Sequence, residues 1–152
     1  MMKLSKKADY GLIALKHLAM HGGRGSCSAG DIAELYKMST PLMAKVLQKL
    51  AKVGLVAARH GSSGGYTLGR DASLISALDV IKAIDGPLFI TSCVTVRGEC
   101  DQSDRCNIRE PLRKVNESIE AVLKRIKISH MREEPETAET ATAKPSELVT
   151  II

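Results

Sequence analysis

The sequence of 152 residues contains no tryptophan, one phenylalanine and three tyrosines, and it has no long apolar run. Proteins that read single strands or RNA stack bases on aromatic side chains, so the scarcity of aromatics argues against these partners. No apolar run approaches the roughly 20 residues of a membrane span. Lys16 and His17 interrupt the apolar stretch 11–20, which excludes a secretory signal there. We therefore expect a cytoplasmic chain without a membrane partner.

Recognisable catalytic motifs are also lacking. The sequence has no phosphate-binding loop, no paired-carboxylate motif and no nucleophile with a base at a suggestive spacing. His17 and His21 share a helical face at i and i+4, a pair that can bind metal, but no third partner is evident. We expect neither an enzyme nor a protein with a small-molecule substrate.

Positive charge is concentrated in the first part of the chain. Residues 1–70 carry 11 basic and 3 acidic side chains, residues 71–131 carry 9 of each, and residues 132–152 carry 2 and 5. Such an excess predicts a polyanionic partner, and the scarcity of aromatics favours double-stranded DNA. The last 21 residues are acidic and mostly Glu, Thr, Ala, Pro and Ser, so we expect a disordered acidic tail over 132–152.

Capping residues and apolar periodicity predict three helices and a hairpin in residues 1–70. Ser5 caps a helix that reaches about residue 20, and Ser28 with Asp31 forms a capping box for a helix over 29–37. Thr40 is the expected N-cap of a third helix that ends near residue 53. The expected core face of this third helix is Met43, Val46, Leu47, Leu50 and Val53.

Two short strands, over 55–59 and 66–68, follow this pair of short helices. A glycine- and serine-rich hexapeptide separates them and makes a flexible hairpin tip. Two helices joined by a tight turn and followed by a hairpin are typical of a winged helix-turn-helix. We therefore predict a DNA-binding region over residues 1–70.

The basic face of the third helix is the predicted reading surface, and the hairpin is the predicted wing. Residues near the helix N-terminus reach base edges or phosphates, and later lysines meet phosphate. The wing supplies basic residues just before its tip and a glycine-rich backbone at the tip. An ordinary solvated face and a plain hairpin turn are the alternatives, which the combination of the two elements disfavours. The predicted DNA-binding residues are Ser39, Thr40, Lys45, Lys49, Arg59, His60, Gly64 and Gly65.

The second half of the chain, over 71–131, is expected to contain a connecting helix, a loop and a long helix. Ser76 opens a helix that ends near residue 85, and residues 88–107 show no periodicity and are expected to form a loop. A helix over 111–128 carries apolar residues three and four apart, which favours a dimer contact over a core helix. This stripe consists of Leu112, Val115, Ile119, Val122 and Ile126. The expected fold class is mainly α with a small β-wing, a winged helix-turn-helix plus a long C-terminal dimerisation helix.

Three of the four cysteines lie close together, at positions 93, 100 and 106, whereas Cys27 is isolated and is interpreted as a packing residue. Clustered thiols in a reducing compartment suggest a metal or redox site rather than disulfides. Gaps of six and five residues differ from the two-residue gaps common in structural zinc sites, but three thiolates on one loop can hold an iron–sulfur cluster with a fourth ligand from elsewhere. Zinc with an acidic fourth ligand, a bare thiol switch and chance remain open at this point.

The sequence resembles the Rrf-two family of winged-helix transcriptional regulators, which includes the IscR, NsrR and SUF-system regulators. The resemblance covers about residues 2–131, and the glycine–tyrosine wing and the cysteine loop are its most specific features. The matching segments are Lys3-Leu-Ser-Lys-Lys-Ala-Asp-Tyr-Gly11, Asp31-Ile-Ala33, Leu50-x-x-x-Gly-Leu-Val56, Gly64-Gly-Tyr66-x-Leu68, Val80-Ile-x-Ala-Ile-Asp85 and the three cysteines.

The resemblance implies a homodimer that holds an iron–sulfur cluster, either 2Fe–2S or 4Fe–4S, through Cys93, Cys100 and Cys106. IscR-like members place a histidine three residues after the last cysteine, where this sequence has Arg109. NsrR-like members take an aspartate from the first helix of the partner subunit, and Asp9 stands at that position. The cysteine spacing and the arginine after it are most similar to SUF-system regulators.

The function implied by the resemblance is regulation of iron–sulfur cluster assembly genes, with the cluster controlling promoter binding. A repressor that senses nitric oxide or redox state is the alternative within the family. A cluster carrier or a zinc-structured binding protein is the alternative from another class, and the basic helix-turn-helix and wing argue against it.

Overall fold

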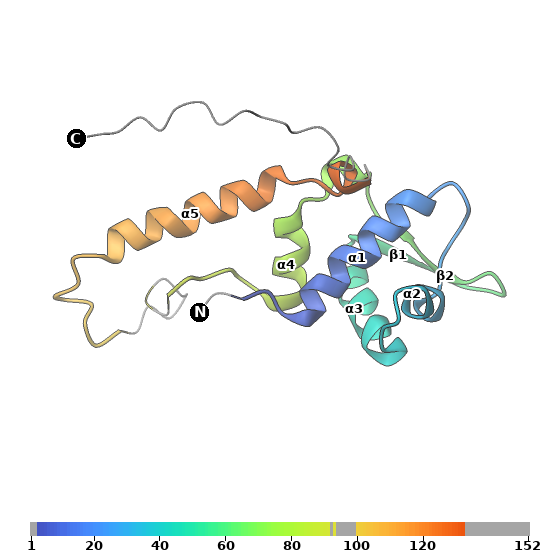
Figure 1. Ribbon diagram of the computed structural model, residues 1–152, viewed down its shortest axis with the longest axis horizontal. Helices are drawn as coiled ribbons and strands as arrows, with labels where there is room; N and C mark the ends of the chain where they lie inside the picture. Colours follow the sequence, from blue (N-terminus) through green and yellow to red (C-terminus); the bar gives the residue numbers. More distant parts are fainter. Residues whose placement is uncertain (1–2, 92, 94–99, 133–152) are drawn as a thin grey trace, which may run out of the picture.

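The structure is a computed structural model that describes residues 3–91, 93 and 100–132. Most of the described chain is helical, and a single hairpin supplies an antiparallel two-stranded sheet (Figure 1). The expected fold class, mainly α with a small β-wing, is confirmed. The elements are α1 (Lys6–His21), α2 (Ala29–Leu35), α3 (Thr40–Lys52), β1 (Val56–Arg59), β2 (Gly65–Leu68), η1 (Ala72–Leu74), α4 (Ala77–Asp85), α5 (Arg109–Arg125) and η3 (Ile128–Arg132).

Side-chain caps fix where the helices of the first half begin. Ser5 caps α1, and the capping box expected between Ser28 and Asp31 is present at α2. At α3 the predicted cap is wrong by one residue: Ser39 has extended backbone and accepts from the amide of Leu42, so Thr40 is already helical. The helix keeps the proline in its first turn, where a missing N–H costs nothing.

The hydrophobic core lies where α1, α3 and α4 cross at Gly11. A Cβ placed on Gly11 would lie 3.1 Å from Val80 Cγ1, 3.4 Å from Ile84 Cγ1 and 3.7 Å from Val46 Cγ1. The absence of a side chain therefore lets three helices approach one point. Leu15, Met43, Leu47, Leu50, Ile75 and Ile128 are among the fully buried side chains around it.

Val53, which the periodicity assigns to this core, is instead 46% exposed. It follows the last helical residue of α3, and Gly54 with φ +76° turns the chain toward β1. The apolar stripe of α3 therefore ends one turn earlier than the sequence pattern does.

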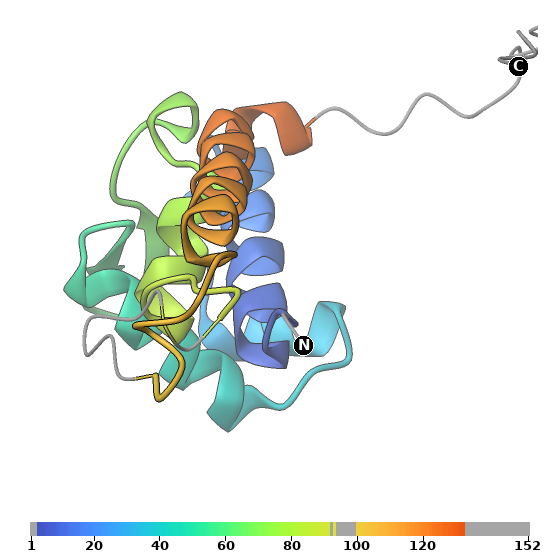
Figure 2. The same cartoon turned by 90° about the vertical axis from the view of Figure 1, so that its left-hand side faces the viewer.

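The long helix α5 projects from the body of the molecule, beside α4 (Figures 1 and 2). Its expected bounds, 111–128, are wrong at both ends, since α5 runs from Arg109 to Arg125. After Arg125 the chain becomes extended: Ile126 O accepts from Ala77 N at 2.8 Å, and Ile128 N donates to Ile75 O at 2.9 Å. This pairing buries Ile128 completely and ends the helix.

No helix in the described part of the chain is long and apolar enough to cross a membrane. The expected disorder of the acidic tail concerns residues that, apart from Arg132 at the end of η3, lie outside the described ones.

The wing is anchored to the body through the backbone of Cys27. Cys27 N donates to Tyr66 O at 3.0 Å, and Tyr66 N donates to Cys27 O at 2.7 Å. The Cys27 side chain packs against the core, as expected for a packing residue. Burial, and then nearby Asp31, raise the pKa of its thiol, which favours the protonated form.

Gly65 should be intolerant of a side chain, because a Cβ there would lie 2.6 Å from the carbonyl carbon and oxygen of Cys27. We expect Gly65→Ala to lower the free energy of unfolding by about 1–3 kcal/mol, since backbone has to move to relieve the contact. Thermal unfolding measures this loss. Gly23→Ala is the matched control, because no atom lies within 4 Å of its added Cβ. Equal melting temperatures for the two variants would contradict this account of the wing anchor.

Candidate DNA interface and cysteine segment

The predicted reading helix α3 follows α2 after a tight turn. Lys37 takes a left-handed conformation with φ +54°, and Met38 N donates to Ala33 O at 2.7 Å, which closes the turn. At the start of α3, Ser39 and Thr40 are exposed, and so is Lys45 one turn later. Polar and basic groups therefore lie on the outer face of the helix, opposite its core stripe.

Lys49 differs from Lys45 in having a hydrogen-bond partner among the described residues. Its ammonium Nζ donates to the carbonyl oxygen of Ile84 at 3.1 Å, in the last turn of α4. A cation at the C-terminal end of a helix is favourable because it satisfies a free carbonyl and complements the helix dipole. Lys49 can contact phosphate only if its hydrogen bond to Ile84 O is broken.

In the wing, basic side chains lie where β1 enters the hairpin tip, and the glycines serve the turn. Arg59 and His60 are exposed. Gly64 N donates to Gly61 O at 3.0 Å, and a Cβ on Gly64 would lie 2.9 Å from Arg59 O and Gly61 O. Gly65 pairs with Arg59 in the β-ladder. The tip is therefore compact, and its glycines are required by its own backbone.

The cysteine segment, residues 86–108, connects α4 to α5. Gly86, with φ +83°, caps α4 and turns the chain out of it. Cys93, Cys100 and Cys106 are free thiols of intermediate exposure. Turns with hydrogen bonds from Ser103 N to Cys100 O and from Arg105 N to Gln102 O, both 3.0 Å, compact the last part of the segment.

Asn116 fastens this segment to α5, and sequence reasoning did not single it out. Its side chain is the buried one on α5, 6% exposed, and its Oδ1 accepts from Ile90 N at 3.0 Å. Three residues later, Cys93 Sγ lies 3.2 Å from Thr91 Oγ1. An asparagine beside the apolar stripe of α5, four residues after Leu112 and three before Ile119, was the sequence signal for this contact.

The donor types fit an iron–sulfur cluster, but the structure does not gather them into a coordination shell. Three accessible thiols without disulfides lie on one segment, as a cluster requires. Within the described residues, however, no three His, Cys, Asp or Glu side chains come close enough to hold a metal ion. Asp9 is exposed in the first turn of α1, where its carboxylate also favours the helix dipole.

His17 and His21 form a packing contact that involves Tyr36 at the end of α2. Their rings stack with centroids 4.1 Å apart, and His17 Nδ1 lies 3.1 Å from Tyr36 Oη. His21 Nδ1 donates to His17 O at 2.9 Å. Burial, and then His21, lower the pKa of His17, which favours a neutral ring. The pair joins α1 to α2, and both Nδ1 atoms are engaged.

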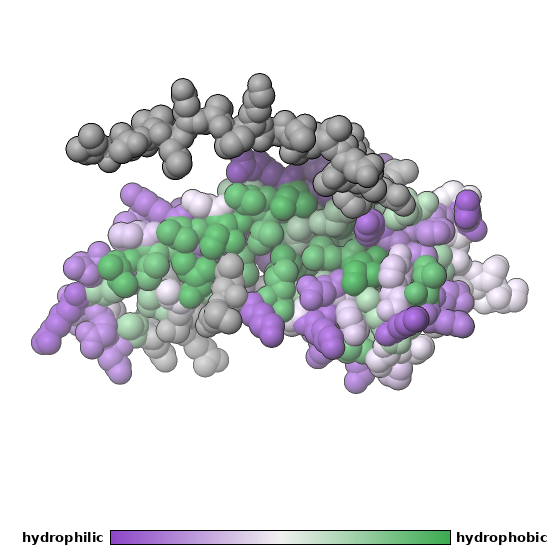
Figure 3. All heavy atoms as spheres, viewed as in Figure 1, coloured by the Kyte–Doolittle hydropathy of each residue, from purple (hydrophilic) through white to green (hydrophobic). Residues whose placement is uncertain are grey.

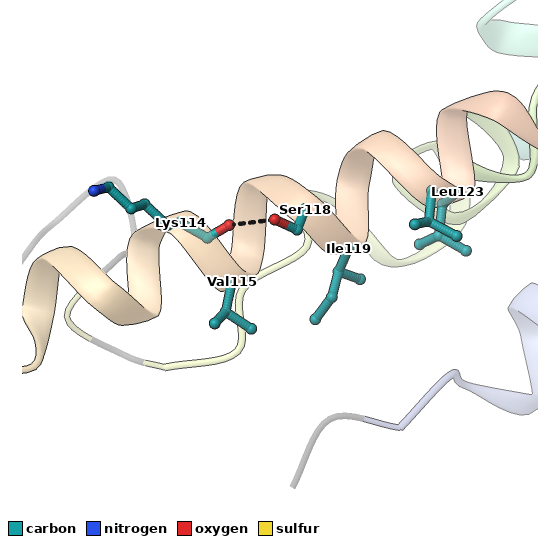
Figure 4. Close-up of a pocket in the computed structure, with 6 residues that line it drawn as sticks. Lys114, Val115, Ser118, Ile119 and Leu123 are labelled. Carbon is teal, nitrogen blue, oxygen red and sulfur yellow. Dashed lines mark hydrogen bonds between the residues drawn. The ribbon is translucent and has the colours of Figure 1, made fainter. Parts of the chain in front are cut away.

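One face of α5 exposes apolar side chains to solvent. Figure 3 shows hydrophobic atoms gathered over this helix, and Figure 4 shows Val115, Ile119 and Leu123 projecting on one side. Val115 and Val122 are 47% and 49% exposed. Ser118 satisfies its hydroxyl within the helix by donating to Lys114 O at 2.8 Å. Three members of the expected stripe, Val115, Ile119 and Val122, line an open apolar surface together with Leu123. Ile126 lies beyond the helix end.

A protein family and a related regulator are similar in sequence to this chain. A profile of the Rrf2 family, described as an iron-dependent transcriptional regulator, matches residues 4–134. The HTH-type transcriptional regulator IscR of Yersinia enterocolitica is 31% identical, over 99% of this chain and 98% of that protein.

Two solved structures are also similar to this chain in sequence and in fold. IscR of T. potens is 32% identical with a TM-score of 0.66, over 86% of this chain and 85% of that one. CymR, described as the global cysteine regulator of B. subtilis, is 28% identical with a TM-score of 0.70, over 87% and 97%. The relatives are transcriptional regulators, which confirms the expectation that this chain is not an enzyme.

Proposed function

The chain belongs to the Rrf2 family of transcriptional regulators, and from this premise we propose that it is a homodimeric DNA-binding regulator whose iron–sulfur cluster controls promoter binding. The observation that carries the proposal is the position of the three free thiols. They lie on one segment between α4, which packs on α3, and α5, whose apolar face is open. Residues 1–70 would read DNA, and residues 71–131 would sense and dimerise.

Residues 1–70 would bind duplex DNA with α3 in the major groove and the wing beside it. Ser39, Thr40 and Lys45 are exposed and available for base edges or nearby phosphates. Arg59 and His60, beside the tip of the wing, would contact phosphate or enter the minor groove. Gly64 and Gly65 would contribute by keeping the tip compact, since their backbone is engaged in the hairpin.

Cys93, Cys100 and Cys106 would hold the cluster, with Asp9 of the partner subunit as the fourth ligand. The cluster, 2Fe–2S or 4Fe–4S, would supply a centre that is sensitive to iron supply and oxidants, since an oxygen ligand makes it labile. The thiolates would then converge, which requires the cysteine segment to close further than in the described structure. The proposed target genes are those for iron–sulfur cluster assembly.

A bare thiol switch is a second candidate, because no three potential ligands among the described residues lie close enough together to hold a metal ion. In that case oxidation of the cysteines, and not cluster occupancy, would change DNA binding. The family also contains CymR, described as a cysteine regulator. Iron and sulfide content separates the two candidates directly.

The open face of α5 would form the dimer interface. Val115, Ile119, Val122 and Leu123 present apolar area that the described chain does not cover. A second copy of the same helix offers a matching stripe, because a twofold axis places like surfaces against each other. Such a dimer would present two winged helices to two half-sites.

Removing a thiol ligand should abolish cluster binding. Protein purified without oxygen should show visible thiolate-to-iron absorption, with iron and sulfide bound, and Cys100→Ser should lose all three. Cys27→Ser is the matched control and should retain them, since Cys27 packs against the core. Operator affinity should differ between cluster-loaded and cluster-free protein. Equal affinity over a broad set of suitable operators would sink the sensing proposal.

Lys45, on the exposed face of α3, should contribute to DNA affinity, whereas Lys127, outside α3 and the wing, should not. Lys45→Ala should weaken operator binding and lower the slope of log K against log salt by about 1, because one phosphate contact is lost. Lys127 lies after α5, away from α3 and the wing, so Lys127→Ala should leave the slope unchanged. Equal slopes in a salt titration of the two variants would remove Lys45 from the interface.

The α5 face should control oligomeric state. Val115→Gln combined with Val122→Gln should weaken the dimer by roughly tenfold or more, because two half-exposed valines lose apolar burial worth on the order of 1 kcal/mol each. Arg125→Gln introduces the same side chain outside the stripe and should dimerise normally. Sedimentation velocity measures both, and an unchanged dimer in the double variant would assign the interface to another surface.

A further inference from the structure

The C-terminal end of α4 is bonded to two other helices. The Asp85 carboxylate accepts twice from Ser5: Ser5 Oγ donates to Oδ1 at 2.5 Å and Ser5 N donates to Oδ2 at 3.2 Å. Ser5 is the N-cap of α1, and its Oγ also accepts from Ala8 N at 3.1 Å. One residue before Asp85, Ile84 O accepts from the ammonium of Lys49 on α3. Residues 80 positions apart are thereby joined at one point.

Electrostatics explains why this junction needs both bonds. A carboxylate at the C-terminal end of a helix is unfavourable to that helix, because the dipole is negative there. The positive N-terminal end of α1 and the ammonium of Lys49 offset this cost from two sides. The contact therefore stabilises an arrangement of three helices more than it stabilises α4 itself.

The junction is also the root of the cysteine segment. Gly86 follows Asp85 and donates to Lys82 O at 3.0 Å, so the segment leaves directly from the bonded end of α4. Asp9, the predicted fourth ligand, lies in the first turn of α1, which begins at the other partner, Ser5. Within one subunit, the segment that carries the predicted cysteine ligands and the helix whose Asp9 is the predicted ligand of the other subunit's cluster thus meet at Asp85. The helix α3 is attached to the same end of α4.

We propose that Asp85 is a positioning residue that couples the cysteine segment to the DNA-reading helix α3. The proposal rests on the cluster-sensing function proposed above. When the thiols of one subunit and Asp9 of the partner subunit are held in a coordination shell, and the second cluster of the dimer does the same, each subunit has both the root of its cysteine segment and its α1 held by a cluster. Asp85 passes this constraint to the end of α4, and Lys49 passes it to α3. Close packing at Gly11 makes the three helices move as one body.

The test compares operator dissociation constants of the full chain with and without its cluster. In the wild type the two constants should differ by about 5-fold to 150-fold, the usual range of coupling between sites. Asp85→Ala removes both acceptors for Ser5, and the ratio should fall toward one while iron and sulfide content stay normal. Asp79→Ala is the control, because it removes a side-chain cap from the other end of α4 without touching Ser5 or Lys49. Its ratio should match the wild type.

Melting temperatures distinguish coupling from stability, since both alanine variants lose a helix-end bond. Asp85→Asn keeps the shape and one good acceptor, and serves if Asp85→Ala does not fold. It should give a ratio between those of the wild type and one. A wild-type ratio retained in the Asp85 variants would reduce Asp85 to a structural cap and overturn this inference alone. A ratio of one in the wild type itself would overturn the sensing function and the inference together.

Discussion

The close approach of α1, α3 and α4 at Gly11 is the constraint on which the arrangement of the protein depends. Any side chain larger than hydrogen at this position meets Val80 and Ile84 of α4 and faces Val46 of α3. The reading helix is therefore held against the helix that leads into the cysteine segment, with α1 across both. Packing sets how closely α1, α3 and α4 approach one another, and hydrogen bonds at the helix ends then set the angles between them.

Much of the first half could be predicted from local chemistry, because the information lies within a few residues. Ser5, Ser28 and Ser76 cap helices as their sequence patterns indicate. The shift from Thr40 to Ser39 is a choice between two neighbouring hydroxyls, and it depends on which residue takes extended backbone. Apolar periodicity likewise identified the core stripe of α3 except at its end, where Gly54 redirects the chain.

What could not be predicted depends on contacts between distant residues. The stop of α5 at Arg125 follows from pairing with residues 75–77, and the periodic stripe continues past it. Lys49 has the same sequence character as Lys45, yet only the packing of α3 on α4 brings its ammonium to Ile84 O. Asn116 shows the same dependence, since its partner lies 26 residues away. For the cysteines, the residue type indicated that they could be metal ligands. The described structure does not bring the three thiols together, and their convergence belongs to the proposed cluster-bound state.

The pairing of Ser76 with Lys127 has a consequence for how such a regulator can vary. It ties the start of α4 to the chain that follows α5, so the cysteine segment joins two helices whose other ends are already paired. The entropy of closing a loop changes only slowly with its length. Residues can therefore be added to the cysteine segment, removed from it or exchanged for different ligands at small cost to α4 and the DNA-reading core. A single architecture is in this way open to many chemical inputs.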